Sequence, residues 1–430
     1  MSSALEIRPL HRPANADVVI PGSKSITNRV LLIAALANGV SHISNPLFSD
    51  DTQVMAGALK ALGMGLESDE DAGAFTVVGT GGHIPVNRAD LFVGNSGTAA
   101  RFLTACLGLG HGTYTLDGVP RMRERPIQDL LDGLRPLGVD VRSRHEDGCP
   151  PVRVNASGIK GGRTTMPGDR SSQYFTALLL VASYAEHDVE IRVLGDLVSR
   201  PYIDLTIHIM QTFGVDVLND AYKTFRVRSG QRYRAQRYQV ESDASNASYF
   251  FAAAALTGGR VKIRGLTAAS AQGDVGFVDV LEKMGCRVAK APNGIEVHGP
   301  RQLAGIDIDL NAMPDVVQTL CALAPFASSP VTVRNVANMR IKETDRIAAL
   351  AAELRKLGVQ VTARDDGLTV YPAASVRPAQ LDTYDDHRMA MSLSLIGLMA
   401  PGIIIRNPEC VNKTFPTYFQ VLETLRRPVP

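Results

Sequence analysis

The sequence predicts an α/β protein of two similar domains, each built from three copies of one structural unit. Three observations support this fold class. The chain has 430 residues, more than one core of ordinary size holds, so two domains are the simplest arrangement. A phrase that ends a helix recurs along the chain at a near-constant interval, and polar phrases that begin apolar helices recur at a similar interval. Together, these observations predict a sixfold repeat spread over two domains.

The recurring phrase consists of an apolar helix ending, a glycine and a short strand, as in LRPLGVDVRS and LRKLGVQVTA. A glycine just past a helix C-terminus adopts a left-handed backbone conformation at little cost. Successive copies lie 71 to 76 residues apart, and the chain has room for six, the last being clipped at LETLRRPVP. The glycines concerned are Gly63, Gly138, Gly214, Gly285 and Gly358.

Each unit is predicted to contain a strand, a buried helix, a strand, an amphipathic helix and two further strands. The final strand pair is visible in VQVTARDDGLTVYP, where apolar residues alternate, and the buried helix in YFTALLLVASYA, which is apolar on all sides. We expect an N-terminal domain over residues 21–240 and a C-terminal domain from residues 1–20 plus 241–430, with the first strand shared between the halves. A single large sheet is the alternative.

Composition excludes several classes of protein. The net charge is only +2, with 45% hydrophobic and 20% charged residues, which disfavours a general nucleic-acid or membrane surface. No signal segment or long apolar run is present, so we expect a cytoplasmic protein. The five cysteines are scattered, and no dinucleotide, ATP or zinc motif stands where its chemistry requires it. We therefore expect no metal and no cofactor.

Six apolar helices are predicted to begin with a polar or glycine-rich phrase at intervals of 70 to 74 residues. Helix capping is the simplest explanation, and it is favoured for ESDASNAS. Four other phrases also carry cations in their first turns, which oppose the helix dipole unless an anion binds there too. The equivalent positions are Ser25, Gly97, Ser171, Ser245, Asp315 and His387, and the cations are Lys24, Arg29, Arg101, Arg170 and Arg388.

Three connecting segments add further charge: residues 120–126 (PRMRERP), 340–346 (RIKETDR) and 412–416 (NKTFP). Any one of them alone could equally be a solvated loop. Together with the helix starts they supply enough cations for a small polyanionic ligand. Candidate acid and base groups are Asp315, Glu343 and the run at residues 385–387.

The phrases PGSKSITNR, GNSGTAAR, PRMRERP, SSQY, SRPYI, KETDR, DDHRMAM and KTFP resemble the EPSP synthase family, also called 3-phosphoshikimate 1-carboxyvinyltransferases, and run in family order from residue 21 to 416. The resemblance implies the pseudo-sixfold enolpyruvyl transferase fold, with three βαβαββ units per domain. It implies transfer of the enolpyruvyl group of phosphoenolpyruvate to the 5-hydroxyl of shikimate 3-phosphate, with release of phosphate, on the shikimate pathway to chorismate and aromatic amino acids. It also implies small-molecule partners only and a monomer without cofactors.

The same resemblance implies a set of site residues. The implied catalytic residues are Asp315 as base, Glu343 as acid and Lys24. Shikimate 3-phosphate would contact Lys24, Ser25, Arg29, Ser171, Ser172, Gln173, Ser199, Tyr202, Asp315, Asn338 and Lys342. Phosphoenolpyruvate would contact Lys24, Gly97, Arg125, Gln173, Arg346, Arg388 and Lys413. Because these residues come from both halves of the chain, we expect the domains to close on the substrates.

Two departures from the family pattern occur in GNSGTAARF, where many relatives read GNAGTAMRP. Ser96 replaces Ala and Phe102 replaces Pro, so we expect weaker binding of glyphosate, the family's inhibitor. UDP-N-acetylglucosamine enolpyruvyl transferase is the alternative function, but its loop cysteine is missing from DGVPRMRERP, and Lys24 is followed by Ser25 rather than Asn. A sixfold sliding clamp is a rival of another class, which would need diffuse basic charge.

Overall fold

The computed structural model describes residues 3–426, and the chain divides into two compact units. Unit 1 consists of Met1–Pro21 and Glu241–Pro430, and unit 2 is Gly22–Val240. The chain therefore passes from unit 1 to unit 2 after Pro21 and returns after Val240.

Unit 2 contains three four-stranded sheets, in the orders β14-β3-β5-β4, β6-β7-β9-β8 and β10-β11-β13-β12. Its strands are β3 (Asn38–Ser44), β4 (Gly65–Asp69), β5 (Ala74–Thr80), β6 (Arg88–Phe92), β7 (His111–Asp117), β8 (Asp140–Ser143), β9 (Val152–Ser157), β10 (Gly162–Pro167), β11 (Val189–Leu194), β12 (Leu218–Asp220), β13 (Thr224–Val227) and β14 (Arg237–Gln239). Its helices are α1 (Lys24–Leu36), α2 (Asp50–Ala61), α3 (Gly97–Leu107), η1 (Met122–Glu124), α4 (Gln128–Leu134), η2 (Arg135–Leu137), α5 (Ser172–Ala182) and α6 (Arg200–Thr212).

Unit 1 contains two four-stranded sheets, β16-β17-β15-β2 and β18-β19-β21-β20, and the three-stranded sheet β1-β23-β22. Its strands are β1 (Ala4–Ile7), β2 (Asn15–Val19), β15 (Arg260–Arg264), β16 (Arg287–Ala291), β17 (Gly294–His298), β18 (Ile306–Asp309), β19 (Val331–Arg334), β20 (Val361–Arg364), β21 (Gly367–Val370), β22 (Ala379–Leu381) and β23 (Ile403–Arg406). Its helices are α7 (Ala244–Thr257), η3 (Gly273–Gly276), α8 (Phe277–Lys283), η4 (Pro314–Val316), α9 (Val317–Leu323), η5 (Ala324–Phe326), η6 (Ala337–Ile341), α10 (Arg346–Lys356), α11 (His387–Gly397), η7 (Pro408–Lys413), α12 (Tyr418–Glu423) and η8 (Thr424–Arg426).

The four-stranded sheets repeat one pairing pattern. β6 pairs in parallel with β7, β7 pairs antiparallel with β9, and β9 pairs antiparallel with β8. The sheet of β18, β19, β21 and β20 follows the same pattern. A strand, a helix, a parallel strand, a second helix and an antiparallel strand pair form each complete unit, which confirms the predicted fold class.

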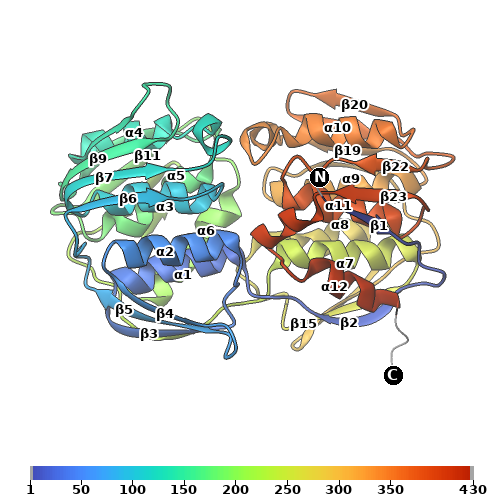
Figure 1. Cartoon of the computed structure of the whole chain (residues 1–430), viewed down its shortest axis with the longest axis horizontal. Coiled ribbons are helices and arrows are strands. Elements are labelled where there is room, and N and C mark those ends of the chain that lie inside the picture. The colour runs from blue at the N-terminus through green and yellow to red at the C-terminus, as the bar shows by residue number, and fades with distance from the viewer. Residues whose placement is uncertain (1–2, 427–430) are drawn as a thin grey trace. The chain divides into compact units, whose positions relative to one another are not determined.

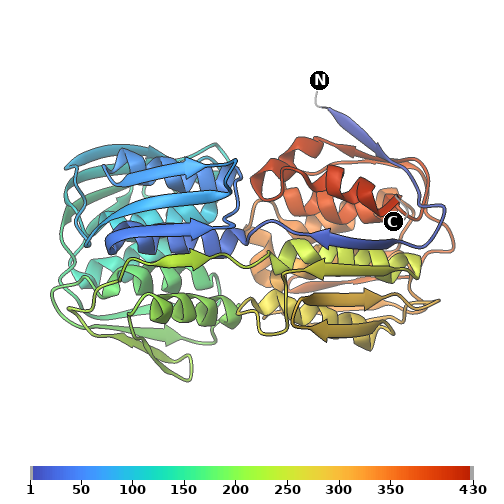
Figure 2. The same cartoon turned by 90° about the horizontal axis from the view of Figure 1, so that it is seen from below.

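The first strand of two repeats is exchanged between the units. β2 pairs in parallel with β15 in unit 1, although the helix that follows β2 in the chain, α1, belongs to unit 2. β14 pairs in parallel with β3 in unit 2 and is followed by α7 in unit 1. In Figure 2 the exchanged strand β2 is the blue arrow beside the yellow strands of unit 1.

The helices that follow the first strand of each repeat form the core of their unit. Every residue of α3 is buried, and α1 is buried from Ile26 to Leu36. In Figure 1, α3 and α5 lie beside each other within unit 2, with β6, β7 and β9 over them. Long apolar runs without a polar face produce this arrangement, because a helix that is apolar on all sides is stable only when surrounded.

The glycines that follow the second helices adopt the predicted conformation, with φ between 79° and 103° at all five positions. The sixth copy differs: its sheet receives β1 from the start of the chain, which pairs antiparallel with β23. Residues 427–430 of the clipped phrase lie outside the described part of the chain. Among residues 3–426, no helix is both long and apolar enough to cross a membrane.

Candidate active site

Polar residues cap the core helices α3, α5, α7 and α11, whereas Ser23 before α1 makes no side-chain cap bond. The Ser96 hydroxyl accepts from the backbone N–H of Ala99 at the start of α3, at 3.4 Å. Asp243 caps α7 through the N–H of Asn246 at 2.8 Å, so the capping explanation favoured for ESDASNAS holds. Asp386 caps α11 through the N–H of Arg388 at 2.9 Å.

In unit 1, a group of buried charges lies where α10 and α11 begin. We call Asp315, Glu343, Arg346, Asp386 and Arg388 the arginine–carboxylate cluster. Arg346 Nε donates to Asp386 at 2.7 Å, and Arg346 Nη2 donates to Glu343 at 2.9 Å. Arg346 Nη1 donates to Asp315 at 3.3 Å. The Arg346 and Asp386 side chains are 1% and 0% exposed, so these charges depend on one another rather than on water.

Asp315 contacts Arg388 within the cluster and Lys342 outside it. Arg388 Nη2 donates to its carboxylate at 2.9 Å and Arg388 Nη1 to its carbonyl at 3.2 Å. The ammonium of Lys342 donates to the same carboxylate at 3.3 Å. Arg388 also approaches the hydroxyl of Tyr249 at 3.4 Å, and burial raises the pKa of Tyr249 to about 12. A carboxylate that contacts three cations lies at the centre of this site.

The carboxylates decide the charge state of Arg346. Burial alone would lower the pKa of its guanidinium, but Asp386, Glu343 and Asp315 outweigh burial and hold the pKa above its usual range. The group therefore stays charged although it is almost fully enclosed.

In unit 2, Arg29 is equally buried, but no carboxylate within residues 3–426 forms an ion pair with it. Its guanidinium donates to the hydroxyl of Thr206 at 2.9 Å and to the carbonyls of Ser25 and Tyr202 at 2.8 and 3.2 Å. It also lies over the ring of Phe102, 5.3 Å from the centroid. Burial lowers the pKa of Arg29 to about 10. Neutral acceptors and a ring face hold this cation.

The remaining groups of unit 2 gather at the starts of α1, α3 and α5. Lys24 forms an ion pair with Asp51 at 3.5 Å. The Gln173 amide donates to the hydroxyl of Thr98 at 3.2 Å, which links the first turns of α5 and α3. Arg125 follows η1, and its Nη1 donates to the Asn95 carbonyl at 2.9 Å, just before α3. Two helix N-termini and these side chains can together hold an anion.

The structure thus connects the predicted site residues into two groups. In unit 1, Lys342, Glu343, Arg346 and Arg388 are linked to one another through Asp315 or Arg346. Asn338 lies on η6 and Lys413 on η7, and both are buried. The residues in unit 2 lie on or beside helix starts: Lys24, Ser25 and Arg29 on α1, Gly97 on α3, Arg125 after η1, Ser171, Ser172 and Gln173 at α5, and Ser199 and Tyr202 at α6.

Asp386 belongs to the run at residues 385–387, which the sequence offers as possible acid or base groups. It caps α11 and binds Arg346, 40 positions earlier in the chain, and this pairing was not predicted. Thr98 and Asp51, which contact Gln173 and Lys24, were not predicted at all. Their only sequence signal is that a polar residue stands in the first turn of a helix.

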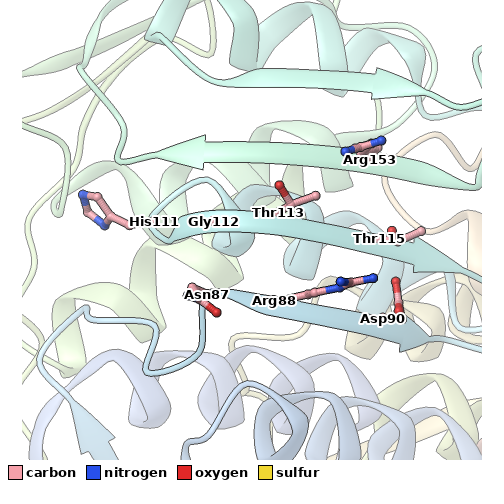
Figure 3. A pocket seen from close by; sticks show the side chains of 8 residues that line it. All are labelled: Asn87, Arg88, Asp90, His111, Gly112, Thr113, Thr115 and Arg153. Carbon is pink, nitrogen blue, oxygen red and sulfur yellow. The ribbon is translucent and has the colours of Figure 1, made fainter.

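A separate cavity of about 580 Å³ lies against β6, β7 and β9 in unit 2. Figure 3 shows Arg88, Thr115 and Arg153 on the three strands around it, with His111 at one end. None of the predicted site residues lines it. Arg88 and Arg153 are exposed, as expected for the solvent face of a sheet, so this hollow is distinct from the candidate site. Within residues 3–426, no cluster of His, Cys, Asp or Glu side chains could hold a metal ion.

Fold and site together are those of an α/β enzyme with cations gathered at helix N-termini, an arrangement suited to small anions. Residues 11–422 match the family described as EPSP synthase (3-phosphoshikimate 1-carboxyvinyltransferase). A 3-phosphoshikimate 1-carboxyvinyltransferase of Nostoc punctiforme is 51% identical over 96% of this chain and 97% of its own length. The chloroplastic enzyme of Brassica napus is 46% identical over 99% of this chain and 86% of its own length.

Solved structures agree with the sequence relatives. EPSP synthase from Acinetobacter baumannii superimposes with a TM-score of 0.82 at 26% identity, over 98% of both chains. The chain therefore belongs to the EPSP synthase family, whose members are transferases of the shikimate pathway for aromatic amino-acid biosynthesis. The nucleotide-sugar transferase alternative is not favoured.

Proposed function

We propose that this chain transfers the 1-carboxyvinyl group of phosphoenolpyruvate to the 5-hydroxyl of shikimate 3-phosphate and releases inorganic phosphate. The observation that carries the assignment is the cluster of Asp315 and Glu343 around one buried guanidinium. It brings two carboxylates and several cations together at the starts of helices, inside a chain of this family. An acid, a base and anion-binding groups are what the reaction requires.

Shikimate 3-phosphate carries a phosphate and hydroxyl groups. We assign its phosphate to hydroxyl groups and helix N–H groups around α5 and α6, and its ring hydroxyls to charged side chains. Arg29 ties α1 to α6 through Tyr202, which supports a role in holding the phosphate-binding helices together. The proposed contacts are Lys24, Ser25, Arg29, Ser171, Ser172, Gln173, Ser199, Tyr202, Asp315, Asn338 and Lys342.

Phosphoenolpyruvate carries a carboxylate and a phosphate, which call for different partners. A guanidinium fork suits the planar carboxylate, so we assign it to Arg346 and Arg388. We assign the phosphate to Lys24, Gly97, Arg125, Gln173 and Lys413. Each nitrogen of Arg346 already donates to a carboxylate, but Nη1 carries two N–H groups and donates one to Asp315 at 3.3 Å. We assign its second N–H to the carboxylate of the substrate.

The chemistry has two steps. In the first, the 5-hydroxyl oxygen bonds to C2 of phosphoenolpyruvate, its proton passes to Asp315, and C3 gains a proton from Glu343. In the second, C3 returns a proton to Glu343 while the bond from C2 to the phosphate oxygen breaks, and the leaving phosphate takes up the proton that Asp315 gained in the first step. Lys24 and Arg125 stabilise the charge on the departing phosphate. Arg346 contacts both carboxylates, so it couples the protonation of the acid to that of the base.

We also infer that units 1 and 2 are the two domains of the enzyme, with boundaries at residues 21 and 240, and that it works as a monomer in the cytoplasm on small-molecule substrates. The expected domain closure stays a prediction. Small-angle scattering with and without substrates would show a smaller radius of gyration on binding, and an unchanged radius under confirmed binding would contradict it.

The test is a phosphate-release assay with each acceptor in turn. Phosphate should appear with shikimate 3-phosphate, and turnover with UDP-N-acetylglucosamine alone would refute the assignment. Asp315→Ala and Glu343→Gln should lower kcat by about a hundredfold or more, whereas Arg388→Ala should mainly raise KM for phosphoenolpyruvate. Asp307→Asn, an exposed carboxylate of unit 1, is the matched control. Near-normal turnover in both carboxylate variants would remove them from the mechanism.

A further inference from the structure

Arg101, on α3, is a buried cation with open donors. Its side chain is 4% exposed, and its Nη2 donates to the carbonyl of Pro126 at 3.2 Å. The Nε and Nη1 atoms are buried and have no acceptor within residues 3–426, and no carboxylate in that range forms an ion pair with Arg101. A buried charge without a counter-charge is unfavourable, so this geometry is suited to an anion that the chain itself does not provide.

A second guanidinium lies at the same point of the backbone. A Cβ placed on Gly97 would lie 2.2 Å from Arg101 Nη1 and 2.4 Å from Arg125 Nη2. Both groups therefore flank the first residue of an eleven-residue helix, whose dipole adds positive potential. A side chain at position 97 would have to displace both guanidinium groups, and the pair is mutually repulsive unless negative charge lies between or beside the groups.

Arg101 also takes part in fixing the backbone next to Arg125. The carbonyl of Pro126 accepts from Arg101 and from the hydroxyl of Tyr174 at 2.6 Å. The Arg101 guanidinium lies over the Tyr174 ring at 5.9 Å, and Tyr174 is fully buried on α5. Two core helices thus hold the residue that directly follows Arg125.

We propose that Arg101 is a positioning residue for Arg125, and that its charge belongs to the subsite for the phosphate group of phosphoenolpyruvate. The proposal rests on the proposed function for the identity of the ligand. It assigns Arg101 two effects: the contact to Pro126 aims Arg125, and the second guanidinium strengthens the field that favours phosphate over less charged groups.

The main experiment replaces Arg101 by Gln and measures both substrates separately. We expect KM for phosphoenolpyruvate and Kd for inorganic phosphate, followed by ³¹P NMR, to rise by about tenfold or more. KM for shikimate 3-phosphate should change by less than about twofold. Arg88→Gln, an exposed cation of the same unit, removes the same charge and should change neither value. Equal effects of Arg101→Gln on both substrates, or no effect, would overturn the proposal.

Two milder variants decide the question if Arg101→Gln does not fold. Arg101→Lys keeps the charge but loses the planar fork, so it should recover part of the phosphate affinity. Tyr174→Phe keeps the ring but loses the donor to Pro126, so KM for phosphoenolpyruvate should rise by about threefold with KM for shikimate 3-phosphate unchanged. If neither variant alters phosphoenolpyruvate or phosphate binding, Arg101 has no role at this subsite.

The phosphate measurement also separates this proposal from the proposed function. A wild-type chain that binds phosphate but does not turn over shikimate 3-phosphate would refute the function, and the loss of phosphate binding in Arg101→Gln would still stand. Normal turnover with unchanged phosphate binding in that variant would refute only the role of Arg101.

Discussion

The two units enclose buried arginines in opposite ways. In unit 1, Arg346 contacts three carboxylates, which hold its pKa above the usual range despite burial. In unit 2, Arg29 contacts two carbonyls, a hydroxyl and a ring face, and burial lowers its pKa to about 10. Unit 1 supplies carboxylates for Arg346, whereas neutral groups hold Arg29 in unit 2. An anionic ligand near Arg29 therefore adds negative charge that the described contacts of this residue do not provide.

The largest expected effect is on the free energy of unfolding, when Arg346 or Arg29 is replaced by Met, an uncharged side chain of similar length. Arg346→Met leaves three buried carboxylates short of their cation and should reduce the free energy of unfolding by about 3–5 kcal/mol. Arg29→Met removes a poorly compensated charge along with its hydrogen bonds, so the loss should be only about 1–2 kcal/mol. Chemical denaturation followed by circular dichroism measures both.

The exposed Arg334, which pairs with Asp307 on the surface of unit 1, provides the control. Arg334→Met should change the free energy of unfolding by less than about 0.5 kcal/mol. If the Arg29 and Arg346 variants lose equal stability, the carboxylates of unit 1 do not compensate Arg346 in the way the geometry indicates.

The contrast also shows which features a sequence reveals. The glycines after helices and the polar residues before them could be predicted, because capping involves groups only a few positions apart. The bond between Asp386 and Arg346 spans 40 positions, and β1 reaches β23 from the other end of the chain. Neither leaves a local pattern. The cations were found because charge at a helix start is unusual, but their pairing with carboxylates from distant parts of the chain was not predicted.

Helix caps give an intermediate effect and extend the comparison to α3 and α7. Asp243→Ala removes a charged cap with a 2.8 Å bond to Asn246, so unit 1 should lose about 1–2 kcal/mol. Ser96→Ala removes a neutral cap with a 3.4 Å bond and should cost about 0.5–1 kcal/mol. Thermal unfolding of the two variants measures the difference.

If Ser96→Ala costs more than Asp243→Ala, the Ser96 hydroxyl has a further role at the start of α3. That result would bear on glyphosate binding, because Ser96 is one of the two departures from the family pattern. Weaker inhibition by glyphosate than in relatives with Ala and Pro at positions 96 and 102 stays a prediction. Equal inhibition of this enzyme and its Ser96→Ala, Phe102→Pro double variant would contradict it.

The smallest effect concerns a buried carboxylate of unit 2 that lacks the close arginine contacts of Asp386. Asp129 on α4 is 9% exposed, and Arg170 approaches one of its oxygens only at 3.4 Å. The other oxygen, Oδ2, has no hydrogen-bond donor within residues 3–426. Burial raises the pKa of Asp129, and Arg170 offsets this only in part. The folded state therefore binds the proton more tightly than the unfolded chain does, and stability falls as pH rises from the unfolded pKa through the folded one.

At neutral pH the charged form of Asp129 destabilises the folded state. Asp129→Asn should therefore increase the free energy of unfolding by no more than about 1 kcal/mol after solvent screening, and raise the melting temperature slightly. The gain should disappear below the ordinary pKa of an aspartic acid, about 3.9, because protonated Asp129 resembles Asn. Asp132→Asn, on the same helix but half-exposed and paired with Arg135, should show no gain at neutral pH. Melting curves across this pH range show whether Asp129→Asn gains or loses stability. A loss at neutral pH would mean that Arg170 compensates the carboxylate fully. Unit 2 would then balance this buried charge as unit 1 balances Arg346.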